Sequence, residues 1–145
     1  MKLAIINGPN LNFLGIREPG IYGNETYEEL IETVMAYGRG KGHVVEIFQS
    51  NSEGALIDYL QYCYFDQVDG IVFNPGAYTH YSYALRDAIA SIKIPTVEVH
   101  LSAIHEREGF RRISVVEEVC VTQISGKKVN GYLEAIDFLE SYKKD

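Results

Sequence analysis

The stretch IINGPNLNFLGIREPGIYG, residues 5–23, begins in an apolar run and then continues as a long irregular loop. Glycines and prolines recur along it, so neither a helix nor a strand can run through it. Most connections in compact domains take about 4–6 residues, and a much longer loop is usually functional. This one carries side chains able to hydrogen-bond, attract an anion or move a proton: Asn10, Asn12, Arg17 and Tyr22. We therefore expect it to form one wall of an active site.

Apolar runs and amphipathic segments alternate on both sides of this loop. Compact apolar runs predict buried strands at residues 2–7, 43–48, 69–73, 96–100 and 119–124. Apolar residues at helical spacing predict helices in the intervals, one after the N-cap Thr26, one after the N-cap Ser52, one through 83–89 and one through 132–139. Thr26 and Glu29 have the spacing of a capping box, which strengthens the first helix.

This alternation predicts right-handed βαβ units and a parallel sheet covered on both faces. Five strands favour an α/β, flavodoxin-like, doubly wound fold with strand order 2-1-3-4-5. The 145 residues are enough for one core, so we expect a single catalytic domain over 1–145. Ligands bind such folds at the carboxyl ends of the strands, where the loops 7–23, 74–80 and 100–112 are expected to meet.

Composition and spacing argue against several classes of function. The net charge of −7, without a basic stripe, argues against nucleic-acid binding. Cys63 and Cys120 form no CxxC pair and the histidines lack metal-ligand spacing, so no metal is expected and the thiols are expected to be reduced. No phosphate-binding glycine motif supports a nucleotide cofactor. No apolar run approaches the length of a membrane span or a signal peptide, which favours a soluble cytoplasmic protein without a membrane partner.

The segment TVEVHLS, residues 96–102, is the sharpest local signal. Side chains alternate along a strand, so Glu98 and His100 share one face. A carboxylate and an imidazole on a buried strand are costly unless they are paired. Glu98 could fix the tautomer of His100 and leave its other nitrogen as a proton donor. From the strand alone, a catalytic pair and a purely structural pair remain equally open.

Other candidates are weaker on their own. Tyr22 is one of eleven tyrosines, so a structural role is favoured for it in isolation. Asn74 and His80 follow a strand and could bind a polar ligand, although an ordinary loop and N-cap would look the same. Asp87 would by default be a surface acid, and Arg111 belongs to a basic turn that could bind a carboxylate or balance nearby acids.

Taken together, these segments resemble the type II 3-dehydroquinate dehydratases. The resemblance covers essentially the whole chain in the family's order, through the motifs NGPNLNFLGIREPGIYG, SNSEGALIDYL, NPGAYTHYSYALRDAI and VEVHLSAIHEREGFR. It implies a lyase of the shikimate pathway, hence of aromatic amino-acid biosynthesis, that dehydrates 3-dehydroquinate to 3-dehydroshikimate through an enolate. It also implies that the reaction needs no metal and no cofactor.

The resemblance further implies a role for each matched residue. Tyr22 would be the base, Arg17 would favour its phenolate, and Asn12 would position a water at the enolate oxygen. His100, oriented by Glu98, would be the acid that protonates the departing hydroxyl. The remaining matched residues would bind the substrate: Asn74, His80, Asp87, Leu101, Ser102 and Arg111. Asp87 would come from an adjacent subunit, because the family assembles as trimers packed into a dodecamer.

Some positions depart from the family pattern. Ala103 stands where Asn is common, and Glu106 where a small residue is usual, so the loop after the fourth strand could pack differently. Two other functions are known for folds of this class, and the first loop and the proton-transfer residues argue against both. A binding module of this fold would have lost a proton-transfer residue, whereas Tyr22 and His100 are both present. A flavodoxin-type redox or receiver domain would need a phosphate-binding first loop or an acidic cluster, which the first loop does not contain.

Overall fold

A computed structural model describes residues 1–16 and 25–142 of the chain. Five parallel strands form one sheet in the order β2-β1-β3-β4-β5, which confirms the predicted topology. They are β1 (Lys2–Asn7), β2 (Val44–Gln49), β3 (Gly70–Asn74), β4 (Thr96–His100) and β5 (Thr122–Ser125). Because β2 and β3 lie on opposite sides of β1, the winding of the chain reverses there. The loops that leave β1 and β3 therefore emerge side by side.

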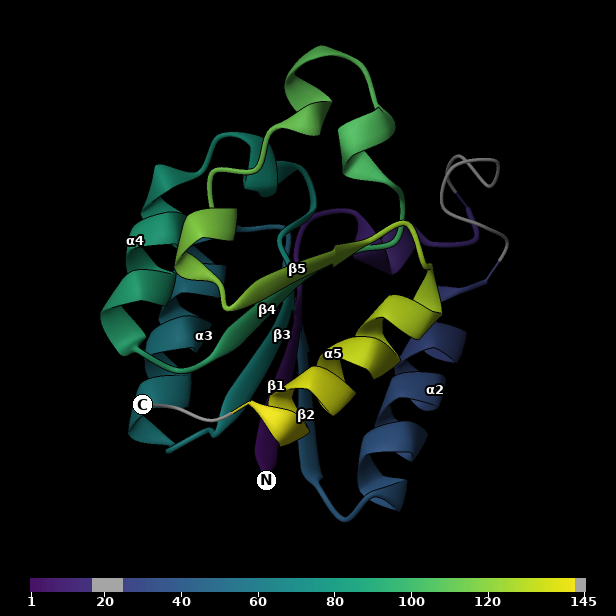
Figure 1. Ribbon diagram of the computed structural model, residues 1–145, viewed down its shortest axis with the longest axis vertical. Helices are drawn as coiled ribbons and strands as arrows, with labels where there is room; N and C mark the ends of the chain where they lie inside the picture. The colour runs from purple at the N-terminus through teal and green to yellow at the C-terminus, as the bar shows by residue number, and fades with distance from the viewer. Residues whose placement is uncertain (17–24, 143–145) are drawn as a thin grey trace.

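Helices cover both faces of the sheet (Figure 1). α2 (Tyr27–Gly40) and α5 (Val129–Ser141) lie on one face, and α3 (Glu53–Phe65) and α4 (Tyr83–Ile92) lie on the other. The alternation of side chains along β1 separates the two cores, since Leu3 packs with α2 and α5 whereas Ala4 packs with α3 and α4. Both faces of β1 are thus apolar, as expected for a central parallel strand.

Short polar side chains set the starts of three helices. The Thr26 hydroxyl accepts a hydrogen bond from the Glu29 N–H at 3.2 Å, and Ser52 accepts from the Ala55 N–H at 3.2 Å. Both N-caps were predicted. The Glu29 carboxylate accepts from the Thr26 hydroxyl instead of the backbone, so the reciprocal half of the capping box is absent. Ser82 caps α4 in the same way.

The predicted fifth strand began too early. Residues 117–119 form the 3-10 turn η5 (Glu117–Val119), and pairing with β4 starts only where Thr122 lies opposite Val97. The Val119 N–H donates to the Val116 carbonyl at 3.1 Å, so it is not available for a strand. The apolar residues that suggested a strand belong to a segment packed against the core beside α3 and α4.

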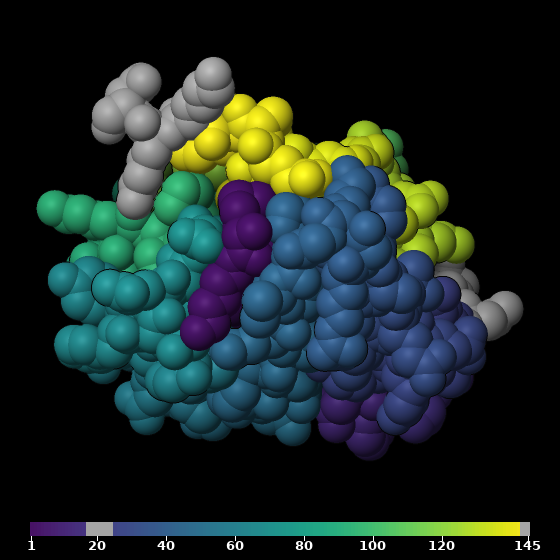
Figure 2. All heavy atoms as spheres, turned by 90° about the horizontal axis from the view of Figure 1, so that it is seen from below, coloured from purple at the N-terminus to yellow at the C-terminus, as the bar shows by residue number. Residues whose placement is uncertain are grey.

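The carboxyl ends of the strands lie at the top of Figure 1, under the chain that connects β4 to β5. That connection contains the 3-10 turns η3 (Ile104–Glu106) and η4 (Gly109–Arg112). Figure 2 shows the opposite edge, where the N-terminal segment crosses the surface between the region that joins α2 to β2 and the teal region of α3. Among the described residues, no helix is both long and apolar enough to cross a membrane.

Candidate active site

The loops after β1 and β3 are in direct backbone contact. The Gly8 N–H donates to the Asn74 carbonyl at 2.8 Å. A Cβ at Gly8 would lie 2.4 Å from the carbonyl oxygen of Pro75, so only glycine allows this approach. Gly76 has a φ of +62° and packs against Pro9, which fixes the second loop against the first. The sequence thus brings the two loops together at the switch point of the sheet.

A cavity of about 220 Å³ opens beside these loops, at the carboxyl ends of β3 and β4. Its lining includes six of the residues predicted to act on or bind the substrate: Asn74, His80, His100, Leu101, Ser102 and Arg111. Leu11, Leu14 and Ile104 supply apolar wall. Pockets for drug-sized ligands are larger, at about 300–1,000 Å³, so this one suits a small polar molecule.

The imidazole of His100 contacts the buried carboxylate of Glu98. His100 Nε2 lies 2.5 Å from Glu98 Oε2, and the exposed fractions of the two side chains are 6% and 0%. The contact predicted from the alternation along β4 is therefore present. A carboxylate accepts hydrogen bonds, so Nε2 carries a proton and the free position of the ring is Nδ1. His100 is also a lining residue of the cavity.

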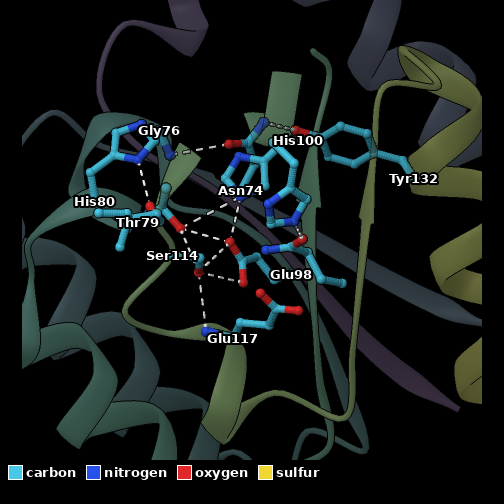
Figure 3. Close-up of polar contacts among 12 residues, drawn as sticks. Asn74, Gly76, Thr79, His80, Glu98, His100, Ser114, Glu117 and Tyr132 are labelled. Atoms are coloured by element: carbon cyan, nitrogen blue, oxygen red, sulfur yellow. Dashed lines mark hydrogen bonds and ion pairs between the residues drawn. The ribbon is translucent and has the colours of Figure 1, made fainter. Parts of the chain in front are cut away.

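Two hydroxyl groups hold the Glu98 carboxylate from the other side (Figure 3). Thr79 Oγ1 donates to Oε2 at 2.7 Å, and Ser114 Oγ lies 2.9 Å from each carboxylate oxygen. Burial alone would raise the pKa of Glu98, but hydrogen bonds from His100, Thr79 and Ser114 outweigh it and hold the pKa below its ordinary value. Glu98 is thus an anion at neutral pH and can balance a charged imidazolium.

His80 presents one ring nitrogen as an acceptor. His80 Nδ1 lies 2.7 Å from the carbonyl oxygen of Ile113, so Nδ1 donates and Nε2 is the free nitrogen. Burial lowers the pKa of His80, which favours the neutral ring. The His80 ring packs edge-on against the Phe110 ring at 5.6 Å between centroids. The Arg111 guanidinium lies 5.1 Å from the centroid of the Phe110 ring. One aromatic side chain therefore orients both polar groups.

Three predicted residues in the described part of the chain do not line this cavity, and one of them is Glu98, which reaches it through His100. Arg17 and Tyr22 lie outside the described residues. Asn12 is in the 3-10 turn η1 (Leu11–Phe13), where its Oδ1 accepts from Gln49 Nε2 at 3.4 Å, and it does not line the cavity. Asp87 lies on α4 and does not line it either. Within the described part of the chain, no three His, Cys, Asp or Glu side chains are grouped so that they could hold a metal ion.

The structure adds polar residues that the sequence did not single out. Thr79 and Ser114 contact Glu98, and Asn7 and Tyr132 form buried hydrogen bonds that lead to Asn74. A buried Asn at the end of β1 was visible in the sequence as a polar residue closing an apolar run. Nothing in the local sequence marked Ser114 or Tyr132, because their partners lie on distant elements.

Comparison with known proteins places this chain in a family. The family model described as Dehydroquinase class II matches residues 1–140. A 3-dehydroquinate dehydratase of Clostridium beijerinckii is 53% identical over 143 residues, which are 99% of this chain and 98% of that protein. The crystal structure of a type II dehydroquinase from Butyrivibrio crossotus has a TM-score of 0.96 and 59% identity, covering 97% of this chain and 98% of that one.

A more distant structure, of a 3-dehydroquinate dehydratase-like protein from Bifidobacterium longum, has a TM-score of 0.69 and 26% identity over 98% of this chain and 99% of that one. Fold and site together define a flavodoxin-like α/β protein with a buried carboxylate–imidazole pair at the carboxyl edge of its sheet. The chain belongs to the class II dehydroquinase family.

Proposed function

We propose that this protein dehydrates 3-dehydroquinate to 3-dehydroshikimate as a lyase that uses no cofactor. The observation that carries the proposal is the Glu98–His100 pair, because its imidazole lines a small cavity together with Asn74, Ser102 and Arg111. Relatives that align over nearly the whole chain are named for this substrate, which supports its identity. The shikimate pathway is the corresponding context, and the unpaired, widely spaced cysteines support a cytoplasmic setting.

The reaction needs a base and an acid. A base removes the proton beside the ketone, and the electrons of that C–H bond form an enolate. When the enolate collapses, the bond from the ring to the C1 hydroxyl breaks, and the hydroxyl leaves as water after it takes a proton. His100 supplies this proton from Nδ1, on the side of the ring away from Glu98. The Glu98 anion stabilises the imidazolium form that donates it.

We assign the base to Tyr22 and the neighbouring positive charge to Arg17, on the resemblance of the loop to the family motif. A guanidinium favours a phenolate, which is the form of tyrosine that can remove a proton. Asn12 is proposed to position a water against the enolate oxygen, where negative charge develops. Its place on the turn that follows the Gly8 contact is compatible with this role.

The remaining lining residues are proposed to bind the substrate. Asn74 and the backbone of Leu101 and Ser102 can donate hydrogen bonds to a carboxylate. His80 can accept one from a ring hydroxyl through its free Nε2, and Arg111 can bind a hydroxyl on the same side. Asp87 would then act in the site of an adjacent subunit, within trimers that assemble into a dodecamer.

Ultraviolet absorbance of the conjugated enone product tests the proposal. Purified protein mixed with 3-dehydroquinate should generate this absorbance, and neither a chelator nor borohydride pretreatment should reduce the rate. His100→Ala should lose most turnover and keep its thermal unfolding midpoint near that of the wild type. His105→Ala is the matched control, since His105 is exposed in the same connection, bonds to Gln123 through its Nε2 and does not line the cavity.

Either of two results would overturn the proposal. Turnover that a chelator abolishes would reject the cofactor-free reaction. No turnover in protein shown to be folded and assembled would favour a binding protein of the same fold instead.

A further inference from the structure

Asn74 is held from behind the cavity by buried hydrogen bonds. Its Nδ2 lies 3.1 Å from the hydroxyl oxygen of Tyr132, and that oxygen lies 2.6 Å from Asn7 Oδ1. Asn7 and Tyr132 have an exposed fraction of 0%, and Asn74 of 3%. Figure 3 shows Asn74 between Gly76 and Tyr132, whose ring reaches it from α5. These buried polar groups are therefore hydrogen-bonded to one another instead of to water.

A backbone group sets the direction of the whole chain of hydrogen bonds. The Gly76 N–H can only donate, and it lies 3.1 Å from Asn74 Oδ1. The amide of Asn74 must therefore turn its NH2 group toward Tyr132, whose oxygen accepts. The single proton of the Tyr132 hydroxyl then goes to Asn7 Oδ1. Asn7 Nδ2 completes the series by donating to the Tyr27 hydroxyl at 3.3 Å.

This arrangement leaves one donor unused. An asparagine amide has two N–H bonds, and Tyr132 accepts only one of those of Asn74. The Gly76 N–H already occupies one lone pair of the Asn74 carbonyl oxygen, whereas the second amide N–H is a donor that Asn74 can offer to the cavity. A donor at this position favours a ligand that places an oxygen atom there. A carboxylate oxygen forms the strongest hydrogen bond to it.

We propose that Tyr132 is a positioning residue that holds Asn74 with its second amide N–H directed at an oxygen of the substrate. Tyr132 does not line the cavity itself, and it acts through Asn74. The inference rests on the proposed function, since the oxygen belongs to 3-dehydroquinate. The series of hydrogen bonds continues from Tyr132 to Asn7, at the end of β1, and to Tyr27, the first residue of α2.

The substitution Tyr132→Phe tests this role, because it keeps the ring and removes the hydroxyl. Asn74 then keeps only the hydrogen bond from the Gly76 N–H, so the direction of its second amide N–H is no longer fixed. A hydrogen bond made equally to substrate and transition state affects KM and leaves kcat nearly unchanged. We expect KM for 3-dehydroquinate to rise about tenfold, the effect of losing one good hydrogen bond to a charged group. Equilibrium binding of quinate, which keeps the carboxylate and lacks the ketone, should weaken similarly.

Tyr59→Phe is the matched control. Tyr59 is a half-buried tyrosine on α3 whose hydroxyl bonds to Glu46 at 3.4 Å, away from the cavity. Its KM and its quinate affinity should equal those of the wild type. If Tyr132→Phe lowers the unfolding temperature but leaves KM and quinate affinity unchanged, Tyr132 is only structural and the inference is wrong.

Two further measurements distinguish a failure of the proposed function from a failure of the inference about Tyr132. Absence of turnover in the wild type would count against the proposed function, whereas the comparison of quinate binding would still decide the role of Tyr132. If Tyr132→Phe does not fold, a crystal structure of the wild type with quinate decides it. We expect Asn74 Nδ2 to lie within hydrogen-bonding distance of both Tyr132 and a ligand oxygen. Ligand contact through Asn74 Oδ1, or no contact, would overturn the inference.

Discussion

Ser114 Oγ lies 2.9 Å from both carboxylate oxygens of Glu98, although the two residues stand on different elements and Ser114 follows the turn η4. The carboxylate thus receives donors from the connection between β4 and β5, from the loop after β3 and from His100. A buried carboxylate with several donors stays ionised and stays in place. The hydroxyls therefore fix the charge and the orientation that His100 depends on.

Thr79→Val should weaken this arrangement with little change in volume. It removes the 2.7 Å hydrogen bond to a buried anion, which is worth about 1.5–3 kcal/mol, together with the longer contact to Ser114 Oγ at 3.3 Å. We expect the free energy of unfolding in urea to fall by about that amount, and kcat to fall more than KM changes, because the acid loses its oriented partner. Ser91→Ala is the control, since its exposed hydroxyl donates to the backbone carbonyl of Asp87 within α4. An unchanged kcat in Thr79→Val would show that His100 does not need this support.

The stability of the protein in acid reports on Glu98. Its pKa in the folded protein lies below the ordinary 4.5, so between those two values the unfolded chain binds more protons. The stabilisation by this carboxylate is therefore complete above 4.5 and is lost as the pH falls through the folded pKa. Glu98→Gln lacks this titration. We expect the stability difference between wild type and variant, from urea unfolding, to shrink as the pH falls below 4.5. A constant difference would mean that Glu98 does not titrate with folding.

Asp87 gives a prediction about shared sites. It does not line the cavity of its own chain, so its proposed role needs a neighbouring subunit. Asp87→Ala and His100→Ala should each have low turnover alone. After the two variants are unfolded together and refolded, mixed assemblies should regain activity, up to about a quarter of the wild-type sites if each site draws one residue from each of two subunits. No recovery in mixed oligomers of normal size would reject a site shared in this way.

The sequence predicted what depends on local periodicity. Alternation along a strand placed Glu98 and His100 on one face, and the order of strands and helices gave the sheet topology. The end of the fifth strand was also close to its predicted position. Its start was wrong because apolar residues pack equally well in a turn such as η5, and only hydrogen bonding distinguishes the two.

Contacts between distant elements could not be predicted in this way. Ser114 reaches Glu98 only because the connection after β4 folds back over the loop that follows β3. Tyr132 reaches Asn74 from α5, across 58 residues of sequence. Each of these residues has an ordinary local context, a polar residue in a loop or an aromatic residue on an apolar helix face. Their roles become visible only when the elements are assembled.

The contact between the first two loops of the site gives a last prediction. In Gly8→Ala the added Cβ would lie 2.4 Å from the Pro75 carbonyl oxygen, so the loops after β1 and β3 must separate. Overpacking of this kind costs about 1–3 kcal/mol. We expect Gly8→Ala to lose that much stability in urea unfolding and to raise KM, since Asn74 stands at the start of the displaced loop.

Gly40→Ala is the control for this substitution. Gly40 is the last residue of α2, and nothing in the described part of the chain lies within 4 Å of a Cβ there. The added methyl group should leave KM unchanged and stabilise the helix by up to about 1 kcal/mol, because alanine loses less backbone freedom than glycine when it becomes helical. If Gly8→Ala behaved like Gly40→Ala in both assays, the close approach of the two loops would not be needed to build the cavity.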